Sequence, residues 1–164
     1  MNKIIFFDMD GVLADFDKAL NGDFRNMFKP GFFRGLEPME NGLNDTIRGL
    51  QARGYTVKIL SKACVKRSDK RFRGQLVDKA NWVKEYLPSI DELDIIIQAT
   101  DESKGDILKY YSKDDKCFLV DDYTPNLATW AFAGGECIKK AKRKKHTRTF
   151  EQILELNDLL GMEL

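Results

Sequence analysis

The chain alternates between short apolar runs and longer segments in which apolar residues recur at helical spacing. The apolar runs are rich in Ile, Val and Phe, which is typical of strands buried on both faces. They lie at residues 3–7, 55–60, 93–97, 116–120 and 136–138. The helical segments lie at residues 41–53, 75–86, 103–111, 125–133 and 150–160. Strands that alternate with helices predict an α/β fold, a Rossmann-like parallel sheet flanked by helices.

The length of the chain suits one domain with a small appendage. The 164 residues are 43% apolar and 32% charged, a balance that allows a core and a solvated surface and argues against disorder. Between the first strand and the first long helix lies an aromatic but irregular stretch. We therefore expect a single domain over residues 1–164, with this stretch as its small appendage.

Several classes of protein are disfavoured by the sequence. No apolar run approaches the roughly 18 residues that cross a bilayer, and the N-terminus has too few apolar residues for a signal peptide, so we expect a cytoplasmic protein without a membrane partner. Cys64, Cys117 and Cys137 are odd in number and widely spaced. They predict neither a disulfide framework nor a zinc site.

The formal net charge of +1 says little about partners, but its distribution is uneven. Seven Lys and Arg side chains lie within residues 139–148. Such a run can bind nucleic acid, or it can be a solvated loop, and we favour the loop.

The polar residues of greatest interest follow the predicted strands. In a parallel sheet, ligands bind beyond the carboxyl ends of the strands, so residues at those ends are expected to meet. The residues found there, in chain order, are Asp8 and Asp10, Ser61, Lys104, and Asp121 and Asp122.

These residue types suit phosphoryl transfer. Crowded carboxylates repel one another unless a cation joins them, and hard oxygen ligands favour Mg²⁺. A carboxylate can attack phosphorus, while a lysine and a hydroxyl stabilise the charge of the phosphoryl group. A second aspartate two residues on could protonate the leaving oxygen and then activate water. Each residue alone could be a turn, cap or surface residue. Their occurrence together, each after a predicted strand, favours a catalytic site.

The segment FFDMDGVL at residues 6–13 resembles motif one of the haloacid dehalogenase superfamily, whose phosphatases carry DxDx(T/V). Ser61, Lys104 and the Asp121-Asp122 pair resemble its motifs two, three and four. The resemblance implies that Asp8 is the nucleophile and a Mg²⁺ ligand, and that Asp10 is the acid/base and binds the metal through its backbone carbonyl. It also implies that Ser61 binds the phosphoryl oxygens and Lys104 neutralises the nucleophile and phosphate. Asp122 would ligate Mg²⁺, supported by Asp121 directly or through water.

A narrower resemblance is to the 5′(3′)-deoxyribonucleotidases of the cytosolic and mitochondrial type. It rests on DMDGVLADF at residues 8–16, PGFF at 30–33 and LEP at 36–38. It implies that Phe16, Phe32 and Phe33 line the pocket for base and sugar, although these rings could equally pack a small cap onto the core. Lys62 stands where those enzymes carry a second small hydroxyl residue, and it could contact phosphate or point to solvent.

The resemblance also implies a small cap insertion, over residues 15–37, and this cap is the main departure from that family. Only residues 17–29 stand where the nucleotidases carry several tens of residues, which leaves room for one helix of about three turns. We expect a Mg²⁺-dependent phosphatase that acts on a small phosphate ester, first of all a deoxyribonucleoside monophosphate. The alternative is the same chemistry on a sugar phosphate or on the phosphate end of a nucleic acid. A binding protein that has lost catalysis is disfavoured, because every motif residue is present.

Overall fold

A computed structural model describes residues 1–140 of the chain. Its centre is a five-stranded parallel sheet with strand order β3-β2-β1-β4-β5. The strands are β1 (Lys3–Phe7), β2 (Tyr55–Lys62), β3 (Ile95–Gln98), β4 (Lys116–Asp121) and β5 (Glu136–Lys139). The predicted α/β class and Rossmann-like parallel sheet are therefore confirmed. The predicted helix at residues 150–160 and most of the basic run at 139–148 lie outside the described residues.

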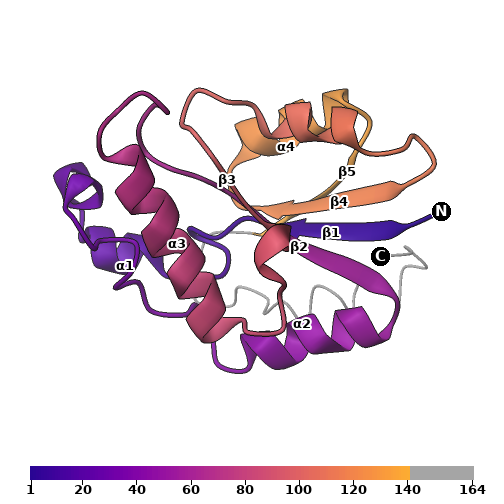
Figure 1. Cartoon of the computed structure of the whole chain (residues 1–164), viewed down its shortest axis with the longest axis horizontal. Coiled ribbons are helices and arrows are strands. Elements are labelled where there is room, and N and C mark those ends of the chain that lie inside the picture. The colour runs from indigo at the N-terminus through magenta and orange to yellow at the C-terminus, as the bar shows by residue number, and fades with distance from the viewer. Residues whose placement is uncertain (141–164) are drawn as a thin grey trace.

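Helices cover both faces of the sheet (Figure 1). The α-helices are α1 (Phe16–Leu20), α2 (Leu43–Ala52), α3 (Phe72–Tyr86) and α4 (Thr124–Phe132). The 3₁₀ helices are η1 (Phe24–Phe28), η2 (Glu92–Asp94) and η3 (Lys104–Tyr110). Where the sequence predicts a helix over residues 103–111, the structure has the 3₁₀ helix η3 instead of an α-helix. This short element packs against α4 so closely that a Cβ on Gly105 would lie 2.3 Å from the Thr129 carbonyl oxygen.

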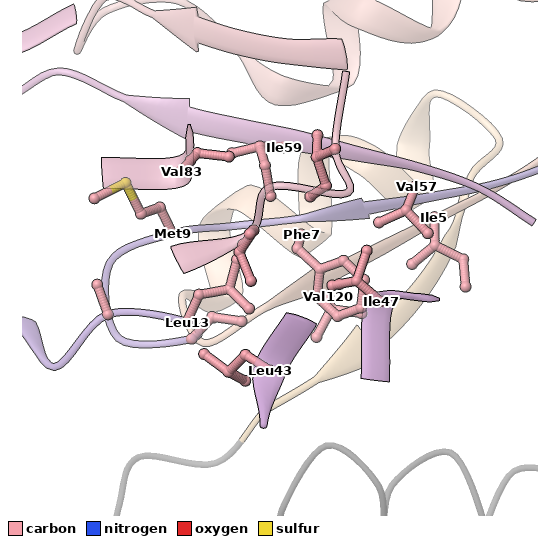
Figure 2. Close-up of a cluster of buried hydrophobic side chains, with 14 of the residues drawn as sticks. Ile5, Phe7, Met9, Leu13, Leu43, Ile47, Val57, Ile59, Val83 and Val120 are labelled. Atoms are coloured by element: carbon pink, nitrogen blue, oxygen red, sulfur yellow. The ribbon is translucent and has the colours of Figure 1, made fainter. Parts of the chain in front are cut away.

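The alternation of side chains along β1 divides the core into two layers. Ile5 and Phe7 face α2 and α3, where they pack with residues such as Ile47 and Val83 (Figure 2). Ile4 and Phe6 point to the opposite face and pack with α4. Because both faces of a central strand are buried, its sequence reads as one continuous apolar run.

The predicted cap, residues 15–37, lies in the segment between β1 and α2. It holds two short helices, α1 and η1, and not one helix of about three turns. The cause is local: Asn21 takes the left-handed conformation that ends α1, and Asp23 then caps η1 with its side chain. In the part of the chain that the structure describes, no helix has the length and hydropathy to cross a membrane.

A short buried hydrogen bond joins the C-terminal end of the cap to α3. The Trp82 indole Nε1, which is fully buried, donates to the Leu36 carbonyl oxygen over 2.7 Å. Trp130 is equally buried, but its Nε1 donates to the Cys117 carbonyl over 3.3 Å. The two tryptophans are therefore alike in burial and differ in the length of this bond.

We predict that Trp82→Phe lowers the free energy of unfolding more than Trp130→Phe does. Both changes remove the same volume, but only the first breaks a short buried hydrogen bond, which adds about 1–3 kcal/mol when the carbonyl is left without its donor. Urea denaturation of the two variants measures the difference. Equal losses would contradict the assigned role of the Trp82 bond.

Candidate active site

The predicted site residues meet where the strand order reverses. From β1 the chain winds outward through β2 and β3, then returns to place β4 on the other side of β1. The Asp8 amide donates to the Val120 carbonyl over 2.9 Å, which continues the β1–β4 pairing by one residue. Asp8 and Asp121 therefore end neighbouring strands. A crevice at such a reversal is the usual ligand site of an open α/β sheet.

A buried lysine links these two carboxylates. Lys104 is the first residue of η3 and only 1% exposed, and its Nζ lies 2.8 Å from both Asp8 Oδ1 and Asp121 Oδ2. Burial alone would lower the pKa of Lys104, but the two carboxylates outweigh it and raise that pKa above its ordinary value. Lys104 is thus a fixed positive charge beside Asp8.

Three carboxylates form a compact group around this lysine. Asp8, Asp121 and Asp122 each offer an oxygen, and these oxygens lie within 4.8 Å of one another. Burial is the main cause that raises the pKa of Asp8 to about 8 and the pKa of Asp122 to about 6, and Asp121 adds to both by repulsion. Crowded carboxylates whose protons are held tightly match the donor set of a hard divalent cation.

Asp121 and Asp122 differ in how they are held. Asp121 is fully buried and also accepts from the Tyr123 amide over 2.9 Å and from Asn126 Nδ2 over 3.1 Å. Asp122 is partly exposed. The hydrogen bonds of Asp121 suit a supporting position, and the freer Asp122 suits direct contact with a cation.

Gly11 makes room for Asp122. Its φ of +78° lies in the left-handed region, and a Cβ at this position would lie 2.3 Å from Asp122 Oδ2. The turn around it is tied by the Leu13 and Ala14 amides, which both donate to the Met9 carbonyl over 2.9 Å. The turn at Asp10-Gly11 therefore reverses the chain and also leaves space for a site carboxylate.

Asp10 and Ser61 are joined by a residue that sequence reasoning missed. Lys79 of α3 is fully buried, and its Nζ lies 2.5 Å from Asp10 Oδ2 and 2.9 Å from Ser61 Oγ. A signal was present in the helix: Lys79 stands four residues from both Gln75 and Val83, on the buried face. A lysine on an inward face needs a charged partner, which here is Asp10.

The three phenylalanines of the cap meet one another. Phe32 contacts Phe16 edge-on at 5.7 Å and Phe33 at 5.1 Å between ring centroids. Phe33 is only 2% exposed, whereas Phe16 and Phe32 are partly exposed. All three pack on the core cluster beneath the sheet. Only Phe16 and Phe32 have appreciable surface to offer a ligand.

Lys62, at the end of β2, is partly buried beside the site. Burial lowers its pKa, and the positive charge of Lys104 lowers it further, against the opposing pull of Asp121 and Asp8. The charged groups of the site therefore affect the pKa of Lys62. The structure brings together Asp8, Lys104, Asp121 and Asp122, and places Asp10 and Ser61 together on Lys79.

A comparison with protein families shows to which family the chain belongs. Residues 20–159 match the family model described as 5′ nucleotidase, deoxy (pyrimidine), cytosolic type C protein. The chain belongs to this family. The matched region contains Ser61, Lys104 and the Asp121-Asp122 pair, while the Asp8–Asp10 segment precedes it. The prediction of a phosphatase of the nucleotidase type is confirmed.

Solved structures share the fold at low sequence identity. A haloacid dehalogenase-like hydrolase of Burkholderia xenovorans LB400 is 17% identical with a TM-score of 0.56, and the match covers 96% of each chain. D,D-heptose 1,7-bisphosphate phosphatase of B. bronchiseptica, in complex with magnesium and phosphate, is 16% identical with a TM-score of 0.57 over 99% of each chain. The resemblance to the haloacid dehalogenase fold is therefore confirmed.

A chain in the structure of the Pnkp1/Rnl/Hen1 complex is also similar, at 17% identity and a TM-score of 0.59. The match covers 88% of the present chain, which spans about half (48%) of that longer chain. No curated protein sequence matches the chain.

We predict that Gly11→Ala weakens cation binding, whereas Gly42→Ala does not. Both glycines have nearly the same positive φ, +78° and +77°, so each alanine adds backbone strain of about 1–2 kcal/mol. Only at Gly11 would the new Cβ also displace Asp122, since Gly42 has open space. Calorimetric titration with Mg²⁺ and a thermal melt separate the two effects. Equal Mg²⁺ affinities for the two variants would show that Asp122 does not bind the cation.

Proposed function

We propose that the protein is a Mg²⁺-dependent phosphomonoesterase that hydrolyses nucleoside monophosphates, deoxyribonucleotides first of all, through an aspartyl-phosphate on Asp8. The observation that carries the proposal is the buried Lys104 ammonium, 2.8 Å from both Asp8 and Asp121 in a member of a nucleotidase family. A carboxylate held beside a fixed cation and further metal-binding oxygens is suited to attack an anionic phosphate.

The reaction would proceed in two displacements. A carboxylate oxygen of Asp8 attacks phosphorus, and the bond to the leaving oxygen breaks with its electron pair on that oxygen, which takes a proton from Asp10. Water then attacks the aspartyl-phosphate, and Asp10 takes a proton from this water. The bond between phosphorus and the Asp8 oxygen breaks, which releases inorganic phosphate and restores both aspartates.

The residues present fit a magnesium ion. Asp8 and Asp122 would bind it directly, with the backbone carbonyl of Asp10, and Asp121 would support it directly or through water. When bound, Mg²⁺ neutralises charge on the phosphoryl oxygens. The magnesium and phosphate bound to the B. bronchiseptica phosphatase support this choice of ion. Ser61, Lys62 and Lys104 would bind the remaining phosphoryl oxygens.

The cap would supply the substrate pocket. Phe16 and Phe32 keep exposed surface for a base or sugar, while Phe33 supports them from the core. Aromatic stacking tolerates different bases, which suits an enzyme that accepts several nucleotides. The family description names a cytosolic type, which supports the expected cytoplasmic location.

We expect Asp8→Asn to lower hydrolysis of deoxyribonucleoside monophosphates at least about a thousandfold, because the amide cannot form the acyl-phosphate. Phosphate release with Mg²⁺ measures the loss. Asp114→Asn is the matched control, since Asp114 is exposed and outside the site, and it should retain wild-type turnover. Wild-type turnover by Asp8→Asn would refute the mechanism.

Mg²⁺ affinity should rise with pH. Without the cation, Asp122 holds its proton up to about pH 6 and Asp8 up to about pH 8, so a cation must displace protons at neutral or lower pH. Calorimetric titrations at several pH values, each in two buffers of different ionisation enthalpy, measure both affinity and proton release. Constant affinity without proton release between about pH 5 and 8 would contradict the site.

A second candidate substrate is the phosphate end of a nucleic acid. Five exposed cationic side chains follow Ser61 and Lys62 in the connection to α3 and in its first turn: Lys66, Arg67, Lys70, Arg71 and Arg73. A panel of mononucleotides, sugar phosphates and phosphorylated oligonucleotides separates the candidates. We expect mononucleotides to be preferred. Preference for oligonucleotides, with steep salt dependence on those alone, would support the second candidate.

A further inference from the structure

The surroundings of Lys79 are unusual for a lysine. Its side chain has no solvent exposure, and the structure places three partners around the ammonium group. Asp10 Oδ2 lies at 2.5 Å, Ser61 Oγ at 2.9 Å and the centroid of the Phe33 ring at 4.1 Å. Two of these partners are carboxylate and hydroxyl groups of the proposed catalytic machinery, and the third is the face of an aromatic ring that attracts cations.

The chemistry of an ammonium group fixes the direction of each hydrogen bond. Lysine has three N–H donors and no acceptor. Ser61 Oγ must therefore accept from Lys79, which leaves the hydroxyl proton of Ser61 to point elsewhere. The hydroxyl becomes a donor for an approaching acceptor, as a phosphoryl oxygen requires.

The same argument distinguishes the two oxygens of Asp10. Oδ2 faces the ammonium of Lys79, so a proton on this carboxyl group belongs on Oδ1. Among the described residues, Oδ1 has no hydrogen-bond partner although it is buried. A buried polar atom without a partner is costly, and an atom that meets its partner only when substrate binds explains that cost.

We propose that Lys79 is a positioning residue: it holds Asp10 so that Oδ1 exchanges the proton with the leaving group, and it turns the Ser61 hydroxyl toward the phosphoryl group. The inference rests on the proposed function. Lys79 touches neither the substrate nor the reacting atoms in this scheme and acts through Asp10 and Ser61. Phe33 then has a defined part as well, because its ring closes the third side of the ammonium group.

The leaving group provides the test. A nucleoside alkoxide needs a proton from Asp10 as it departs, whereas p-nitrophenolate is a much weaker base and departs without one. In Lys79→Met, which keeps an unbranched side chain, we expect kcat on a deoxyribonucleoside monophosphate to fall about a hundredfold or more. On p-nitrophenyl phosphate we expect a loss under about tenfold, the part that comes from Ser61.

A double-mutant cycle shows whether Lys79 acts through Asp10. In an Asp10→Asn background, the further change Lys79→Met should lower nucleotide turnover by less than about tenfold, because the role of Asp10 is already lost. Lys79→Met alone leaves the buried carboxylate of Asp10 without its cation, which could prevent folding. The double variant has no such carboxylate, so it can be compared with Asp10→Asn if Lys79→Met alone fails to fold. Lys140→Met is the control, because Lys140 is also buried, at 3% exposed, but donates to the Val12 carbonyl. It should change the turnover of both esters by the same factor.

The outcomes separate the two proposals. A wild-type protein that hydrolyses neither ester would overturn the proposed function together with this inference. A wild-type protein that hydrolyses both esters, with Lys79→Met losing both equally, would overturn only the inference. A loss from Lys79→Met that is as large in the Asp10→Asn background as in the wild type would overturn it too.

Discussion

The ammonium group of Lys104, held between two buried carboxylates, is the interaction on which the site depends. Asp8 and Asp121 end neighbouring strands and cannot both be charged and buried without a cation between them. The strands bring the carboxylates together, and η3 brings the lysine. The packing of η3 on α4 is therefore a condition for the charge balance of the site, as well as a part of the core.

A second buried lysine plays a similar part beside Asp10, two residues after Asp8. Lys79 joins Asp10 to Ser61, so the two aspartates of the first turn each have their own buried cation. The two lysines serve different needs in the proposed chemistry. Lys104 lies beside the proposed nucleophile, where negative charge must be tolerated, and Lys79 lies beside the group that gives and takes a proton. Without both cations the turn after β1 would hold two carboxylates with little to offset their burial.

Much of the fold could be predicted from the sequence because β1 and β4 are apolar on both faces. Residues 3–7 were predicted as they occur, and the rule that ligands bind beyond strand ends located Asp8, Lys104 and the Asp121-Asp122 pair. Lys79 was not predicted because helical spacing can place a lysine on the inward face of α3 but cannot identify the charged partner that it needs there. Its partner is sixty-nine residues away in the chain, and no local pattern reports such a contact.

The cap shows the same limit in another form. The sequence predicted the length of the cap but not its two short helices. The reason is that a single residue in the left-handed conformation, Asn21, decides where α1 ends. The substrate-binding roles proposed for Phe16, Phe32, Phe33 and Lys62 also depend on side-chain exposure, which the sequence does not contain. Burial separates Phe33 from its two neighbours.

The attachment of the cap has a consequence for how substrates are chosen. Beyond the Trp82 bond, the Cys64 thiol donates to the Met27 carbonyl over 3.5 Å, and the Arg71 guanidinium lies 5.0 Å from the centre of the Phe28 ring. A cap fastened to the core at several points favours a permanently shaped opening over a hinged lid. Substrates would then be selected by whether they fit this fixed opening. The reaction would not have to wait for the cap to close.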